Sequence, residues 1–108
     1  MLMKSEKLSD FHLGWFVGNF EPSLLKNQHV EIAVKHFTKG ETEPSHKQLV
    51  ATELTVVVSG KIKMNDEFFS SGEIVIIPPG EYANFEALED SSLVCVKFPS
   101  IPADKVLL

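Results

Sequence analysis

The sequence contains no arginine, because all ten of its basic residues are lysines. Lysine carries a compact point charge, whereas the planar guanidinium of arginine binds carboxylates and phosphates through two parallel hydrogen bonds. The absence of arginine argues against a site for a nucleotide sugar or for the carboxylate of an amino acid. Fifteen acidic residues give a net charge of −5, which repels phosphate backbones and anionic membrane surfaces. We therefore expect neither nucleic acid nor a membrane as a partner.

Cysteines and long apolar runs are also scarce. Cys95 is the only cysteine, so an intramolecular disulfide is impossible, and its place between Val94 and Val96 is typical of a small buried apolar residue. No apolar run approaches the ~18 residues of a membrane-spanning helix, and the polar start of the chain differs from a secretory signal. These absences predict a soluble, unprocessed protein in the cytoplasm.

The sequence shows no internal repeats, charge blocks or linker-like tracts. Its six glycines and six prolines are spread out along the chain. A length of 108 residues suits a single hydrophobic core. We expect one domain over residues 1–108, in which residues 1–20 form an N-terminal segment that packs on the domain or on a partner subunit.

The chain does contain a series of short segments with β-strand character. His29–Phe37 alternates, with His36 on the same face as Val30, Ile32 and Val34, and this pattern favours a core position for His36. Pro99 and Pro102 are expected to end the regular structure. The other predicted strands cover residues 53–59, 62–64, 68–69, 73–77, 84–88 and 93–98, with turns at Asn65-Asp66 and Pro78-Pro79-Gly80. Short strands separated by turns predict an all-β sandwich or barrel.

Two of these strand-like runs, Leu54–Val58 and Ile74–Ile77, are apolar on both faces. A lone barrel needs apolar residues only on its inner face, so something is expected to cover the outside. The candidates are the same surface of a second subunit and the aromatic residues of the N-terminal segment, namely Phe11, Trp15, Phe16 and Phe20. We expect a homodimer that uses both.

The spacing of residues from Gly40 to Ala87 carries the most information. Gly40 is followed by five residues, His46-Lys47-Gln48, four residues, Glu53, six residues and Gly60; later come Gly72, five residues, Pro78-Pro79-Gly80, two residues and Ala83. This pattern resembles the two conserved motifs of the cupin superfamily, G-x5-H-x-H-x4-E-x6-G and G-x5-P-x-G-x2-H-x3-N. The resemblance implies a double-stranded β-helix, which is a small jelly-roll barrel and is commonly dimeric.

In the cupin motifs three histidines and one glutamate converge on a metal ion, and residues i and i+2 of a strand can do so because they point to the same face. Here His46 and Glu53 stand at ligand positions, but Gln48 replaces the second histidine and Ala83 the last. An amide oxygen is a poorer ligand than imidazole for transition metals, and alanine offers none. Replacement ligands could come from His36, Glu81, Tyr82 or Asn84.

Three functions follow as alternatives, and whether the chain is an enzyme stays open. The first is a protein that binds a small, largely neutral molecule, without a metal, in a pocket lined by His46, Gln48, Glu53 and Ala83. The second is an enzyme of the dioxygenase or isomerase kind with a divalent transition metal on His46, Glu53 and, weakly, Gln48. The third is a non-catalytic dimerisation or interaction module. Without a metal, a buried Glu53 is a possible general base, since burial raises the pKa of a carboxyl group.

Overall fold

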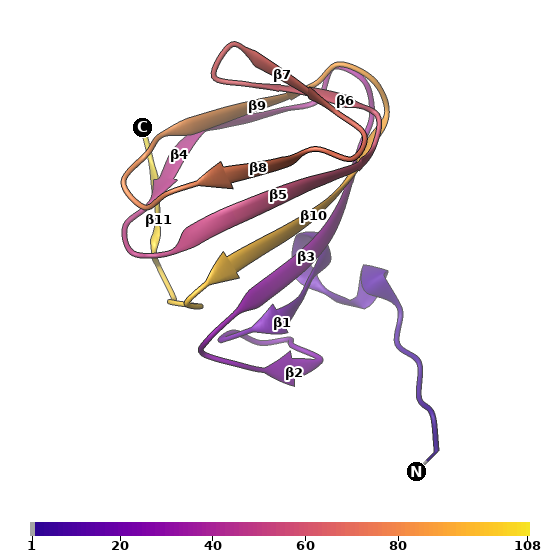
Figure 1. Cartoon of the computed structure of the whole chain (residues 1–108). Helices are drawn as coiled ribbons and strands as arrows, with labels where there is room; N and C mark the ends of the chain where they lie inside the picture. The colour runs from indigo at the N-terminus through magenta and orange to yellow at the C-terminus, as the bar shows by residue number, and fades with distance from the viewer. Residues whose placement is uncertain (1) are drawn as a thin grey trace.

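A computed structural model of the chain, which describes residues 2–108, is built almost entirely of β-strands (Figure 1). In order along the chain, the elements are the 3-10 turns η1 (Leu8–Asp10) and η2 (His12–Gly14), then β1 (Trp15–Gly18), β2 (Leu25–Lys26), β3 (Glu31–Phe37), β4 (Thr42–Gln48), β5 (Thr52–Ser59), β6 (Lys61–Met64), β7 (Glu67–Ser70), β8 (Ile74–Ile77), β9 (Ala83–Ala87), β10 (Ser91–Phe98) and β11 (Lys105–Leu107). None of the described residues belongs to a helix long and apolar enough to span a membrane.

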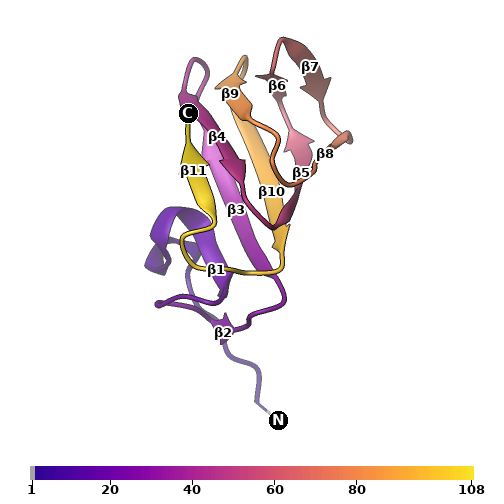
Figure 2. The same ribbon diagram turned by 90° about the vertical axis from the view of Figure 1, so that its left-hand side faces the viewer.

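The strands form two sheets, which lie face to face in Figure 2. The six-stranded sheet has the order β2-β1-β3-β10-β5-β8, and the five-stranded sheet has the order β11-β4-β9-β6-β7. Side chains from both sheets meet in one core, in which Val57, Ile62 and Leu93 are the largest fully buried members. The predicted all-β architecture is therefore confirmed.

The predicted strands are present with small shifts at their ends, and the Asn65-Asp66 turn has the positive φ angles of 48° and 64° that a two-residue hairpin needs. The prediction that Pro99 and Pro102 end the regular structure is wrong. The chain forms β11 after these prolines, because Lys105–Leu107 can pair with the free edge of β4. Strand β4 itself is polar and contains Pro44, which lies beside a shift of register between β4 and β9.

The alternation of β3 is confirmed, but its apolar face points away from the barrel. Ala33 on the other face is fully buried, while His36 is exposed and its Nδ1 lies 2.8 Å from the Ser92 Oγ. The expectation of a core histidine is therefore wrong. The physical reason is a row of outward apolar residues in register across four strands, which consists of Val34, Val94, Val56 and Ile74.

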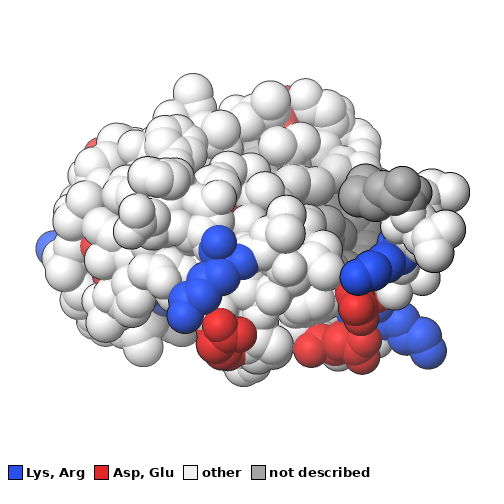
Figure 3. All heavy atoms as spheres, turned by 90° about the horizontal axis from the view of Figure 1, so that it is seen from below, with Lys and Arg blue, Asp and Glu red and all other residues white. Residues whose placement is uncertain are grey.

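The outer face of the six-stranded sheet is apolar over these four strands. Val58, Ile74 and Ile76 are 54%, 58% and 68% exposed. None of the outward positions on these strands is an aspartate, glutamate or lysine; they are Ile32, Val34, His36, Thr52, Leu54, Val56, Val58, Ile74, Ile76, Ser92, Val94, Val96 and Phe98. The side of the molecule below this sheet in Figure 1 likewise shows few charged side chains (Figure 3).

The N-terminal segment does not cover this outer face as a unit. Trp15 points into the barrel, where it packs against the core, while Phe11 lies near Val34 at the β3 side. Leu2 and Met3 are 87% and 98% exposed at the end of a strand-free arm that extends away from the barrel (Figures 1 and 2). Met1, which belongs to the predicted segment, lies outside the described residues.

Candidate functional site

The residues at the motif positions do not share one cavity. His46 on β4 and Glu53 on β5 both line a cavity of about 130 Å³ inside the barrel. Gln48 lines a different cavity of about 350 Å³, and Ala83 lines a third hollow beside Tyr82. The predicted pocket of all four residues is thus divided in the structure. We call the cavity of His46 and Glu53 the inner cavity and that of Gln48 the outer cavity.

Charged side chains that the motif did not indicate form much of the inner wall. Lys97 on β10 is in register with Glu31 on β3 and with Glu53 on β5, so a row of alternating charge crosses the inner face of the sheet. The Lys97 Nζ lies 3.8 Å from the Glu53 Oε1, and both side chains are only 10% exposed. A second pair joins the Lys35 Nζ to the Glu43 Oε2 at 3.4 Å.

Trp15 holds these two ammonium groups on one aromatic surface. The Lys97 Nζ lies 4.7 Å from the centroid of the indole ring, and the Lys35 Nζ lies 5.3 Å from it. A cation over an aromatic face gains about 0.5–1 kcal/mol at an exposed site and more when it is desolvated. Trp15 therefore helps to compensate the dehydration of both lysines.

Burial shifts the pKa of four groups around the cavities. Burial lowers the pKa of His46, despite the hydrogen bond from its Nδ1 to the Pro44 carbonyl at 3.2 Å, and this favours the neutral imidazole. Burial raises the pKa of Glu31, an effect that the nearby Lys97 opposes. Burial also lowers the pKa of Lys105. The thiol of Cys95 is buried as predicted, and this raises its pKa to about 11.

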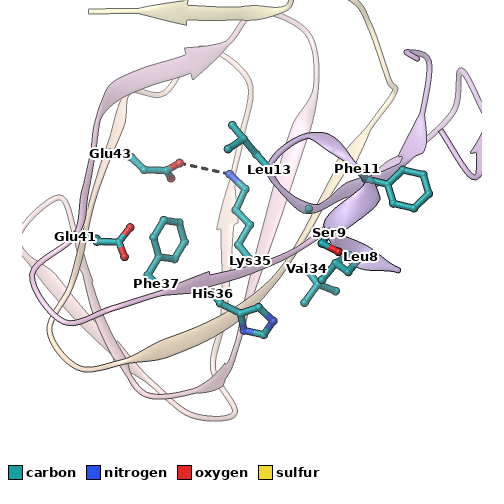
Figure 4. Close-up of a pocket in the computed structure, with 11 residues that line it drawn as sticks. Leu8, Ser9, Phe11, Leu13, Val34, Lys35, His36, Phe37, Glu41 and Glu43 are labelled. Atoms are coloured by element: carbon teal, nitrogen blue, oxygen red, sulfur yellow. Dashed lines mark hydrogen bonds and ion pairs between the residues drawn. The ribbon is translucent and has the colours of Figure 1, made fainter. Parts of the chain in front are cut away.

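The larger groove outside the inner cavity is shown in Figure 4. It has a volume of about 560 Å³ and lies between the N-terminal segment and β3. Leu13, Lys35 and Glu43 line both the groove and the inner cavity, so the groove adjoins the cavity at the Lys35–Glu43 pair. His36, Glu41 and Phe37 complete the polar and aromatic side of the groove.

The residues present do not fit the metal ion that the cupin resemblance implies. Among residues 2–108, no group of three or more His, Cys, Asp or Glu side chains is placed to hold a metal. The Lys97 ammonium lies beside the Glu53 carboxylate and would repel a second cation there. The possible replacement ligands, His36, Glu81, Tyr82 and Asn84, all lie outside the inner cavity. The role of Glu53 as a general base stays a prediction.

The sequence did contain a signal for the lysines and glutamates that were missed. Glu31, Ala33 and Lys35 alternate with the apolar residues of β3, and Lys97 alternates with Val94 and Val96 on β10. If the apolar faces of β3 and β10 lie on the same side of the sheet as Leu54 and Val56 of β5, the charged residues of all three strands lie together on the opposite side. The sequence could not show by itself which of the two faces points inward.

We predict that Glu31→Gln increases stability at neutral pH and flattens its pH dependence. The pKa of Glu31 is raised in the folded protein. At pH values just above the usual pKa of a carboxyl group, the folded state therefore binds more protons than the unfolded state. The free energy of unfolding then falls as the pH rises through this window. Glutamine removes that loss and can still accept the hydrogen bond from the Ser100 Oγ, which lies 3.1 Å away. Urea unfolding from about pH 4 to about pH 8 measures the effect.

The exposed Glu67 on β7 provides the matched control, Glu67→Gln. An unchanged pH profile in Glu31→Gln, or a lower stability than that of the wild type at pH 7, would contradict this interpretation of Glu31.

No protein-family model matches the sequence, and no curated protein matches it. Solved structures do match the fold. An uncharacterized conserved protein with a double-stranded beta-helix domain from Klebsiella pneumoniae has a TM-score of 0.73 and 20% identity, over 99% of this chain and 98% of that chain. An RmlC-like cupin from Shewanella frigidimarina has a TM-score of 0.65 and 18% identity, over 70% of this chain and 71% of that chain.

The DMSP lyase DddQ from Ruegeria pomeroyi also matches, with a TM-score of 0.71 and 15% identity. The alignment covers 86% of this chain but 49% of the lyase. Identities this low establish the fold and carry no activity from one protein to another. They confirm the architecture that the motif spacing implied: the chain has the double-stranded β-helix fold of the cupin proteins.

Proposed function

We propose that the barrel binds a small polar molecule of no net charge in the inner cavity, without a metal ion. The observation that carries this proposal is the set of charged groups on the cavity wall. Three carboxylates face three ammonium groups; they are Glu31, Glu43 and Glu53 against Lys35, Lys97 and Lys105. With a neutral His46 the wall has no net charge, so neither a cation nor an anion is favoured over a zwitterion or a polyol.

The size of the cavity supports a small ligand. A volume of about 130 Å³ corresponds to about four water molecules at roughly 30 Å³ each. Drug-sized ligands occupy cavities of about 300–1,000 Å³. Glycine and glycerol are of a suitable size, and both carry donors and acceptors without a net charge.

A metal-dependent enzyme of the dioxygenase or isomerase kind is the alternative that the fold suggests. It would need His46 and Glu53 as ligands, yet Glu53 already has Lys97 as a cationic partner. Two ligands of this kind seldom hold a transition metal tightly. The buried ion pair is the reason that we favour a metal-free binding protein.

Nuclear magnetic resonance with glycine and glycerol tests the proposal. We expect both compounds to shift the Trp15 indole and His46 ring signals, and we expect acetate and methylammonium to shift them much less. Cys95→Leu adds volume to the cavity wall without changing its charge, so it should abolish the shifts, while Cys95→Ala should retain them. Equal shifts in both variants would show that the probes bind elsewhere, and the absence of any shift would refute the proposed ligand class.

Elemental analysis of protein from cells grown with added iron, nickel, manganese and zinc tests the alternative. We expect far less than one metal ion per chain. One ion per chain that is lost in His46→Gln would favour the metal-dependent enzyme instead.

A specific observation favours an additional function as a homodimer. The outer face of β3, β10, β5 and β8 is largely apolar and has no aspartate, glutamate or lysine, so it offers little to a charged partner, whereas a second copy of the same face can bury it. A buried thiol such as that of Cys95 is also compatible with the cytoplasm, the location that we propose for the dimer.

Sedimentation velocity tests the dimer. We expect a dimer at micromolar concentration, and we expect Ile76→Asp to weaken it at least about tenfold, because the loss of one buried isoleucine contact exceeds about 1.4 kcal/mol. Phe68→Asp is the matched control, since Phe68 is also exposed, at 61%, but lies on the five-stranded sheet. A monomeric wild type, or equal weakening by the two variants, would rule out an interface on this face.

A further inference from the structure

The outer cavity is a separate space at one end of the barrel. It has a volume of about 350 Å³ and lies beside the loop that joins β10 to β11. Phe20, Ile101 and Pro102 provide an apolar wall, and Gln48 and Lys105 provide a polar one. Only Glu31, Lys97 and Lys105 are shared with the inner cavity.

The amide of Gln48 is a buried donor without a partner. Gln48 is 4% exposed, and its Nε2 makes no hydrogen bond to any part of the described chain. An unpaired buried amide costs free energy, and buried polar groups normally have a partner in the protein, in water or in a ligand. The main chain of Gln48 is well anchored, since its carbonyl accepts a hydrogen bond from the Gly80 N–H at 2.8 Å.

Other polar groups around this cavity are already engaged. The Oδ1 and Oδ2 of Asp104 accept the N–H groups of Val50 and Ala51, each at 2.9 Å. The Ser100 Oγ accepts the Asn19 N–H at 2.8 Å and donates to the Glu31 Oε1 at 3.1 Å. These groups support the wall and leave little capacity for a ligand.

Lys105 supplies a second free donor next to Gln48. The two residues are register partners in the β11–β4 pair, so their side chains leave the same face of the sheet with Cβ atoms about 5 Å apart. No ion pair within 4.0 Å among residues 2–108 includes Lys105. One neutral and one cationic donor therefore lie side by side at the edge of a cavity with an apolar wall.

We propose that the outer cavity binds a small monocarboxylic acid. One carboxylate oxygen accepts a hydrogen bond from the Gln48 Nε2, the other faces the Lys105 ammonium, and the body of the acid packs on Phe20, Ile101 and Pro102. A planar group with two acceptor oxygens matches this pair of donors, although the chain has no arginine for the same purpose.

The charges around the outer cavity favour a monoanion over a dianion. The carboxylates of Glu31 and Asp104 already balance the ammonium groups of Lys97 and Lys105, so the second negative charge of phosphate or sulfate is disfavoured. An apolar cavity of about 150 Å³ holds benzene, so a cavity of about 350 Å³ has room for benzoate. The contact with Gln48 belongs to the outer cavity alone, whereas Lys105 lines both cavities, so the signals of Gln48 and Trp15 are read together to separate the two sites.

Titration of the full chain with sodium benzoate tests the proposal. We expect the side-chain amide signal of Gln48 to shift in a saturable way, while the Trp15 indole signal, which reports on the inner cavity, changes little. Lys105→Met should raise the dissociation constant for benzoate at least about tenfold, and Gln48→Leu should raise it as well. Lys63→Met removes the same charge from the distant Lys63–Asp66 pair and should leave binding unchanged.

Two probes separate a carboxylate site from simpler binding. Benzyl alcohol has the same ring without the charge, and sodium sulfate has charge without the ring; neither is expected to saturate the Gln48 signal. If Gln48→Leu fails to fold, the comparison of Lys105→Met with Lys63→Met still decides the outcome. The proposal is overturned if benzoate leaves the Gln48 amide unshifted, if Lys105→Met binds as the wild type does, or if sulfate binds equally well.

Discussion

The row of alternating charge formed by Glu31, Lys97 and Glu53 on the inner face of the sheet is the constraint on which the rest of the structure depends. Taking charges out of water costs several kcal/mol per ion, and the mutual attraction of the ions compensates this only when each has a partner. The register of β3, β10 and β5 places Lys97 between Glu31 and Glu53, the Lys97 ammonium pairs with the Glu53 carboxylate, and the Trp15 ring covers Lys97. The row also places an ammonium group beside the carboxylate that the cupin motif would give to a metal.

The apolar outer surface follows from the same register. Because successive residues of a strand point to opposite faces, strands that carry lysine and glutamate inward carry their valines and isoleucines outward. The barrel thus has charged side chains around a small cavity beside its apolar core, and an apolar exterior on one sheet. Both proposals about partners, a small neutral ligand inside and a second copy outside, rest on this arrangement.

The sequence predicts the fold well because spacing and turn chemistry are local properties. The positions of Gly40, Gly60 and Gly72 imply the β-helix, and each has a positive φ near 90°. Only at Gly60 would a Cβ also clash, since it would lie 2.2 Å from the Ser91 Oγ. Strand β11 could not be predicted, because it exists only through pairing with β4.

The site was less predictable than the fold, because it depends on which face of each strand points inward. His36 was expected inside and lies outside, while Lys97 gave no signal in the motif and lies at the centre of the site. Gln48 stands at a metal-ligand position of the motif, but it lines a different cavity from His46 and Glu53. Alternation gives two faces, and only the assembly of all the strands decides which one is the interior.

A double-mutant cycle on Lys97 and Glu53 tests the central claim most directly. With Lys97→Met or Glu53→Met alone, the account predicts a loss of about 3–5 kcal/mol in the free energy of unfolding, because each change leaves a buried charge without its partner. The double variant should lose much less than the sum, since two apolar side chains then replace the pair. Additive losses would contradict the claim that this ion pair organises the interior of the barrel.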